Sequence, residues 1–184
     1  MKFLLITLTV LQSLFAALEQ KTLQSEFTIS IADAQTQPMT YSGSITMHGR
    51  QFALEMFNLE AAYDGNTLYM YSEDTEEITL STPSEEELVQ ANPFLYAQAL
   101  LPVCKQVEKT IGDNTQITLT PDDASAGISK FVLRVLTATL LPLSAEIHEA
   151  DGKITTLRLT KAQYTDTVPI FTIEKEGALI NDLR

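Results

Sequence analysis

The sequence is dominated by short segments in which apolar and polar residues alternate. Segments such as EFTISIA (26–32) and TQITLT (115–120) place every second side chain on one apolar face, the period of a half-buried β-strand. Turn signals such as Asp151-Gly152 separate the segments. The pattern predicts about ten or eleven antiparallel strands, the last of them at 170–174.

Helix is predicted in only a small part of the chain. Ser84 can cap a helix, and Glu87 lies three residues later, as in a capping box. Asn92 is a second cap signal, and Pro93 suits the first helical position that follows it. We therefore expect two short helices inserted into a chain of strands.

Sheets of this size curl, because every apolar strand face must be covered. The predicted fold class is α+β, mainly β: an incomplete antiparallel β-barrel with a short helical lid. Short helices can cap such a barrel but cannot fill it, which leaves an apolar pocket suited to an apolar ligand. The alternative is a core filled by the same side chains.

Apolar residues on the expected inward faces are the candidate site. The predicted cavity residues are Phe27, Ile29, Ile45, Met47, Phe52, Leu54, Met56, Leu68, Met70, Phe131, Leu133 and Val135. The predicted lid residues are Leu88, Phe94, Leu95 and Leu100.

The N-terminus, MKFLLITLTVLQSLFAALEQ, has the layout of a secretory signal peptide. Lys2 precedes an apolar run that ends at small residues, and we expect cleavage near Ala16 or Ala17. The domain division is then a signal peptide over 1–17 and one globular domain over 18–184. The alternative is an amphipathic helix that stays on the protein, since leucines recur at helical spacing up to Leu18.

Charge and motif content exclude several classes of function. A formal net charge of −12 argues against nucleic acid and against anionic lipid head groups as partners. The sequence has no nucleophile elbow, phosphate-binding loop or zinc-protease motif, and its histidines, His48 and His148, are too few for a histidine-rich metal site. We expect no enzyme, no metal and no cofactor. The single cysteine, Cys104, is expected to be a partly buried free thiol.

Several motifs, in their order and spacing, resemble those of the periplasmic outer-membrane lipoprotein carrier family, LolA, in its Bacteroidetes-type form. They are the DG-x-T-x-x-x-Y hairpin (64–71), STPSEEEL (81–88) followed by NPF (92–94), and the terminal INDLR (180–184). The resemblance covers most of the chain after residue 17. It implies an incomplete barrel whose cavity holds the acyl chains of lipoproteins in transit to the outer membrane.

One segment departs from the family pattern. Better-known members carry an RPGKFRW-like segment whose second Arg bonds to the lid, whereas this chain reads HGRQFALEM (48–56), with His48 for the Pro and Ala53 for that Arg. We therefore expect no latch at position 53 and closure by apolar contacts alone.

The resemblance also implies a setting for the protein. Expected partners are acylated lipoproteins, an inner-membrane lipoprotein-releasing transporter and an outer-membrane acceptor; we expect a monomer in the periplasm. A carrier or sensor of free lipid or glycolipid on the same fold is the alternative function. A structural or adhesive β-domain with a filled core is the third.

Overall fold

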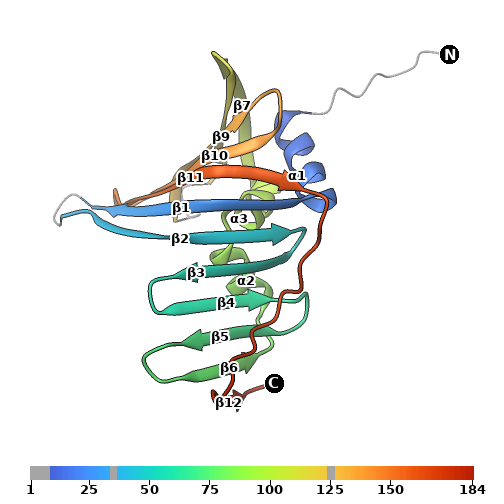
Figure 1. Cartoon of the computed structure of the whole chain (residues 1–184). Coiled ribbons are helices and arrows are strands. Elements are labelled where there is room, and N and C mark those ends of the chain that lie inside the picture. The colour runs from blue at the N-terminus through green and yellow to red at the C-terminus, as the bar shows by residue number, and fades with distance from the viewer. Residues whose placement is uncertain (1–8, 34–36, 124–126) are drawn as a thin grey trace.

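The computed structural model describes residues 9–33, 37–123 and 127–184 of the 184-residue chain. One twelve-stranded sheet in the order β12-β6-β5-β4-β3-β2-β1-β11-β10-β9-β8-β7 forms most of it (Figure 1). The strands are β1 (Thr22–Ala32), β2 (Met39–His48), β3 (Gln51–Met56), β4 (Leu59–Tyr63), β5 (Leu68–Ser72), β6 (Glu77–Ser81), β7 (Cys104–Ile111), β8 (Asn114–Pro121), β9 (Ile128–Leu136), β10 (Leu141–Glu149), β11 (Ile154–Thr165) and β12 (Leu179–Asp182).

Two runs of antiparallel hairpins build this sheet, one from β1 to β6 and one from β7 to β11. The pairing of β1 with β11 joins them, so that Phe27 of β1 lies opposite both Gly43 of β2 and Leu159 of β11. The sheet is curved and its ends do not meet, which confirms the predicted incomplete barrel with a helical lid (Figure 1).

The C-terminal segment differs from the sequence prediction. Residues 170–174 form no strand, whereas β12 is a strand and pairs with β6 in parallel. The predicted strand was wrong because the alternating residues lie on the sheet rather than beside an edge: Phe171 and Ile173 are buried. Ile173 packs with Ala62 and Ile78, on the face of β3–β6 opposite the main core.

The described residues form the α-helices α1 (Val10–Gln20), α2 (Glu85–Ala91) and α3 (Pro93–Leu100), and the 3₁₀ turn η1 (Leu101–Val103) follows α3. The capping signals predicted for α2 and α3 are confirmed. The Ser84 side chain accepts a hydrogen bond from the Glu87 N–H, and the Glu87 carboxylate accepts one from the Ser84 N–H. We call residues 85–100 the α2–α3 lid.

The turn between β4 and β5 is fixed by one carboxylate. Asp64 Oδ1 accepts hydrogen bonds from the backbone N–H groups of Asn66 (2.8 Å) and Thr67 (2.7 Å), and Oδ2 accepts one from the Tyr69 hydroxyl (3.1 Å). Burial alone would raise the pKa of Asp64, but these hydrogen bonds outweigh it and hold the pKa below its ordinary value. The charged carboxylate therefore stabilises this turn.

Helix α1 is integrated into the core. Its buried side chains are Leu11, Leu14, Phe15 and Leu18, and its last turn is tied to the β2–β3 turn by the Gly49 N–H, which donates to the Leu18 carbonyl (2.7 Å). At its start, the Glu108 carboxylate of β7 accepts hydrogen bonds from the N–H groups of Val10 (3.1 Å) and Leu11 (3.0 Å).

The predicted signal peptide overlaps this helix. Residues 1–8 lie outside the described residues, but cleavage near Ala16 or Ala17 would remove Leu11, Leu14 and Phe15 from the core. Cleavage itself stays a prediction. The alternative, in which the helix remains on the protein, stays a prediction as well.

Candidate functional site

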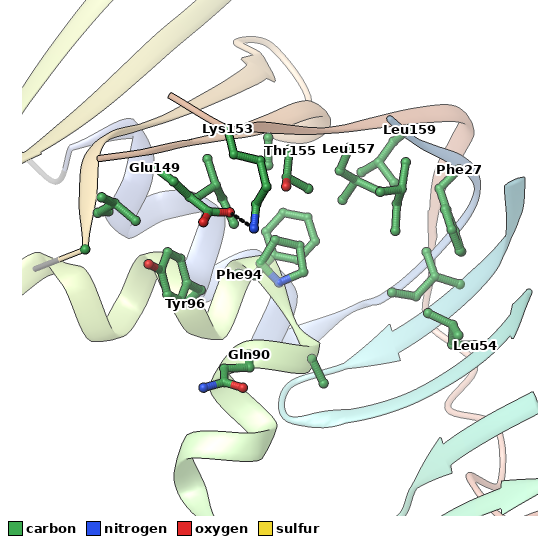
Figure 2. A pocket seen from close by; sticks show the side chains of 18 residues that line it. Phe27, Leu54, Gln90, Phe94, Tyr96, Glu149, Lys153, Thr155, Leu157 and Leu159 are labelled. Carbon is green, nitrogen blue, oxygen red and sulfur yellow. Dashed lines mark ion pairs between the residues drawn. The ribbon is translucent and has the colours of Figure 1, made fainter. Parts of the chain in front are cut away.

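A pocket of about 640 Å³ lies between the inner face of the sheet and the α2–α3 lid (Figure 2). Its volume falls within the range of about 300–1,000 Å³ that small-molecule pockets occupy. It is lined by Phe27, Ile29, Ile45, Leu54, Gln90, Ala91, Pro93, Phe94, Tyr96, Gly127, Ile128, Ala145, Ile147, Glu149, Lys153, Thr155, Leu157 and Leu159. Most of these side chains are apolar, so the pocket favours an apolar ligand.

Strand register forms the apolar wall. Gly43 lies opposite Phe27 and leaves space for its ring: a Cβ atom at position 43 would stand 2.8 Å from Phe27 Cζ and 2.1 Å from the Glu55 carbonyl oxygen. Ile45 and Leu54 are cross-strand partners on the same face. Gly43 thus permits a close approach between Phe27 and β2.

The lid contributes the opposite wall. Asn92 joins α2 to α3, and its Oδ1 accepts hydrogen bonds from the N–H groups of Phe94 (2.9 Å) and Leu95 (3.3 Å). Among the described residues, Asn92 Nδ2 is a buried donor with no hydrogen-bond partner. The cap fixes the start of α3, so that Phe94, which is 2% exposed, lines the pocket.

One end of the pocket is polar. Lys153 Nζ lies 2.8 Å from Glu149 Oε1, and Thr155 is next to them on the lining (Figure 2). The hydrogen bond to Glu149 raises the pKa of Lys153, so the ammonium form is favoured. Burial, with a smaller contribution from the Glu149 charge, raises the pKa of Tyr96. These groups can donate hydrogen bonds to a polar part of a ligand.

The lid is also held by an ion pair. Arg50, at the β2–β3 turn, places Nη2 2.5 Å from Glu85 Oε2 at the start of α2. The hydrogen bond raises the pKa of Arg50 and lowers the pKa of Glu85. Ala53 faces away from the lid and packs with Ala62, Ile78 and Ile173. The expectation of closure by apolar contacts alone was therefore wrong.

The structure divides the predicted site residues between pocket and core. Those that line the pocket are Phe27, Ile29, Ile45, Leu54 and the lid residue Phe94. Those packed in or against the main core are Met47, Phe52, Met56, Leu68, Phe131, Leu133, Val135, Leu88, Leu95 and Leu100. Met70 is 39% exposed.

The predicted cavity residues include none from β10 and β11, although both strands line the pocket. The lining residues Ala145, Ile147, Leu157 and Leu159 lie at alternating positions of the two strands. Their place in the pocket could have been inferred from the pairing of the two strands. The polar residues Glu149 and Lys153 carry no such signal, because charged residues beside a turn are normally solvent-exposed.

The described part of the chain also bears on three other features: a metal site, a membrane-spanning helix and a reactive cysteine. No group of three or more His, Cys, Asp or Glu residues there is arranged to hold a metal ion. No helix in residues 9–33, 37–123 and 127–184 is long and apolar enough to cross a membrane. Cys104 is partly buried, and burial, with a smaller contribution from the Asp122 charge, raises its pKa, which disfavours the reactive thiolate.

Two solved structures with TM-scores above 0.5 share this fold. An uncharacterized conserved protein from Thermus thermophilus superposes with a TM-score of 0.63 at 10% identity, covering 94% of this chain and 96% of that one. The complex of MucA and MucB from Pseudomonas aeruginosa gives 0.52 at 16% identity, covering 87% of this chain but 57% of that chain. A LolA superfamily protein, NE2245 from Nitrosomonas europaea, gives 0.44 at 14% identity, covering 90% of this chain and 99% of that one.

No protein-family model and no curated protein matches the sequence. Identities of 10–16% show a shared fold and nothing beyond it. The LolA-like family named from the sequence motifs therefore stays a prediction.

Proposed function

We propose that this protein is a carrier that shelters the acyl chains of lipoproteins in its pocket and delivers them to the outer membrane. The observation that carries the proposal is the apolar pocket of about 640 Å³ beneath the α2–α3 lid. The filled-core alternative does not fit this geometry, because Phe27, Leu54 and Leu157 border a space that no side chain of the described residues occupies.

The energetics suit a carrier. Each buried methylene contributes about 0.8 kcal/mol, so one ordinary acyl chain would gain on the order of 10 kcal/mol on leaving water. Release requires the lid to move. The Arg50–Glu85 ion pair lies between side chains that are 45% and 68% exposed, and water and salt screen such a pair, so it contributes little to stability. The tie therefore permits opening at modest cost.

The proposal includes a setting. We place the protein in the periplasm, with acylated lipoproteins as cargo and with an inner-membrane lipoprotein-releasing transporter and an outer-membrane acceptor as partners. The MucA/MucB structure supports a protein partner in one respect: this fold occurs there in a complex. We propose no enzymatic activity, no cofactor and a monomeric state.

Substitution in the pocket tests the proposal. Leu54→Glu places a charge on the apolar wall and should abolish binding of a fluorescent acyl probe to the purified protein. It should also abolish release of acylated lipoproteins from spheroplasts. Ile170→Glu is the matched control, because Ile170 is 85% exposed. Phe94→Glu should repeat the effect from the lid side.

Undiminished binding and release by both pocket variants would refute the proposal. The second candidate function, a carrier or sensor of free lipid or glycolipid, is supported by the same pocket. Native mass spectrometry of protein extracted from the periplasm separates the two, since a bound lipoprotein and a bound free lipid differ by the mass of a polypeptide.

A further inference from the structure

The inward face of the β10–β11 hairpin changes from apolar to polar towards its turn. Residues two apart on a strand share a face. The lining residues are Ala145, Ile147 and Glu149 on β10, Lys153 just before β11, and Thr155, Leu157 and Leu159 on β11. A ligand with one apolar chain and one polar end therefore fits with its polar end at the turn and its chain along Leu157 and Leu159.

The turn holds its two charged side chains in place. The Glu149 N–H donates to the Lys153 carbonyl (2.8 Å), and the Gly152 N–H donates to the Glu149 carbonyl (3.2 Å). The Ala150 N–H ties the turn to β9 through the Gly127 carbonyl (3.0 Å). Figure 2 shows the Lys153 ammonium directed into the pocket beside Phe94, with the Glu149 carboxylate against it.

This pair treats charged and uncharged ligand ends differently. The ammonium has three N–H donors, and Glu149 Oε1 lies opposite one of them, so an ester or amide carbonyl can accept another with the pair intact. The carboxylate of a free fatty acid at Lys153 would lie beside the Glu149 carboxylate, and the charges of Asp151 and Asp33 also act on Lys153. These negative charges would repel the ligand carboxylate.

We propose that the Glu149–Lys153 pair makes the pocket select acyl chains joined through uncharged ester or amide carbonyls and discriminate against free fatty acids. This inference rests on the proposed function, because it assigns the ligand class of the same pocket. It gives the ion pair a role in specificity: a carrier that rejected free fatty acids would stay available for acylated cargo.

Two probes of equal chain length test the selection. A pyrene-labelled fatty acid and its N-methyl amide are titrated into the purified protein at a pH at which the acid is ionised. The wild type should bind the amide more tightly. Glu149→Gln removes the competing carboxylate and should tighten binding of the acid by about fivefold, the equivalent of ~1 kcal/mol, and should change the affinity for the amide by less than that.

Two further variants keep the test decisive. Glu26→Gln is the matched control: Glu26 pairs with Lys161 (2.6 Å) among exposed side chains and does not line the pocket, so it changes the net charge equally and should leave both affinities unchanged. Lys153→Gln leaves Glu149 without its cation and should lower the affinity for the acid more than the affinity for the amide. Unfolding midpoints in urea show whether each variant is folded.

The outcomes separate the two proposals. A wild type that prefers the acid, or an equal change in acid affinity in Glu149→Gln and Glu26→Gln, overturns the selection and leaves the carrier function standing. Failure of the wild type to bind either probe overturns the carrier function and this inference with it.

Discussion

Removal of residues 1–17 should unfold the protein, because it takes helix α1 apart at its buried face. Leu11 and Leu14 are 0% exposed and Phe15 is 9% exposed. Loss of three such side chains costs about 2–5 kcal/mol each, or roughly 6–15 kcal/mol together. A typical domain is stable by only about 5–15 kcal/mol. We therefore expect a fragment of residues 18–184 to show no cooperative unfolding transition.

The assay is urea denaturation followed by circular dichroism. A fragment beginning at Thr9 keeps the capping box of α1 and serves as the reference. In that reference, Leu14→Ala should lose about 2–5 kcal/mol. Ala16→Ser, on the exposed face, should change stability by less than about 0.5 kcal/mol.

Equal midpoints for the 18–184 and 9–184 fragments would refute the reasoning. That result would also remove the structural objection to a signal peptide cleaved near Ala17. A cooperative 9–184 fragment beside an unfolded 18–184 fragment would show that α1 belongs to the folded domain.

Four other predictions concern single sites. Gly43→Ala should lower the free energy of unfolding by about 1–3 kcal/mol, because its Cβ has no room, and an unchanged urea midpoint would contradict this. Asp64→Ala should lower the free energy of unfolding above pH ~4, where the carboxylate is charged. The difference in this free energy between variant and wild type should shrink as the pH falls through the lowered folded-state pKa of Asp64. A difference that stays constant with pH would show that the charged carboxylate does not stabilise the turn. Cys104 should react with a maleimide more slowly at neutral pH than free cysteine does and speed up as the pH rises, and a fast neutral reaction would show an exposed thiolate. Arg50→Gln should raise the association rate of an acyl probe and leave the stability nearly unchanged, because the ion pair is exposed. High salt should raise the same rate in the wild type. Identical rates for the variant and the wild type would show that the bond to Glu85 does not restrain the lid.

The sheet, the hairpins and the lid caps could be predicted because their signals are local. Ser84 and Asn92 cap helices wherever the chain folds, and each strand shows its apolar face by alternation. The parallel pairing of β12 with β6 could not be predicted, since it depends on a long connection that crosses the sheet.

The division between pocket and core depended on where α1 lies. Ile45 and Met47 share a face of β2 and both are buried in the main core, but Ile45 also lines the pocket and Met47 does not. Met47 lies near the end of β2, and α1 contacts this strand and is bonded to the following turn at Gly49. Alternation along a strand does not show this cover, so the sequence pattern placed both residues in the cavity.

The C-terminal segment should make the β1–β6 half of the sheet stiffer than the β7–β11 half. It leaves β11 in the middle of the sheet, crosses the outer side with Ile173 against Ala62 and Ile78, and ends on β6. Lys175 adds an ion pair to Glu60 (2.5 Å). Because the C-terminal segment is held at both ends, it resists any decrease in the curvature of β1–β6. When a bulky ligand enters, we expect strands β7–β10 to move outward before β1–β6 do, so the pocket would widen from that half of the sheet.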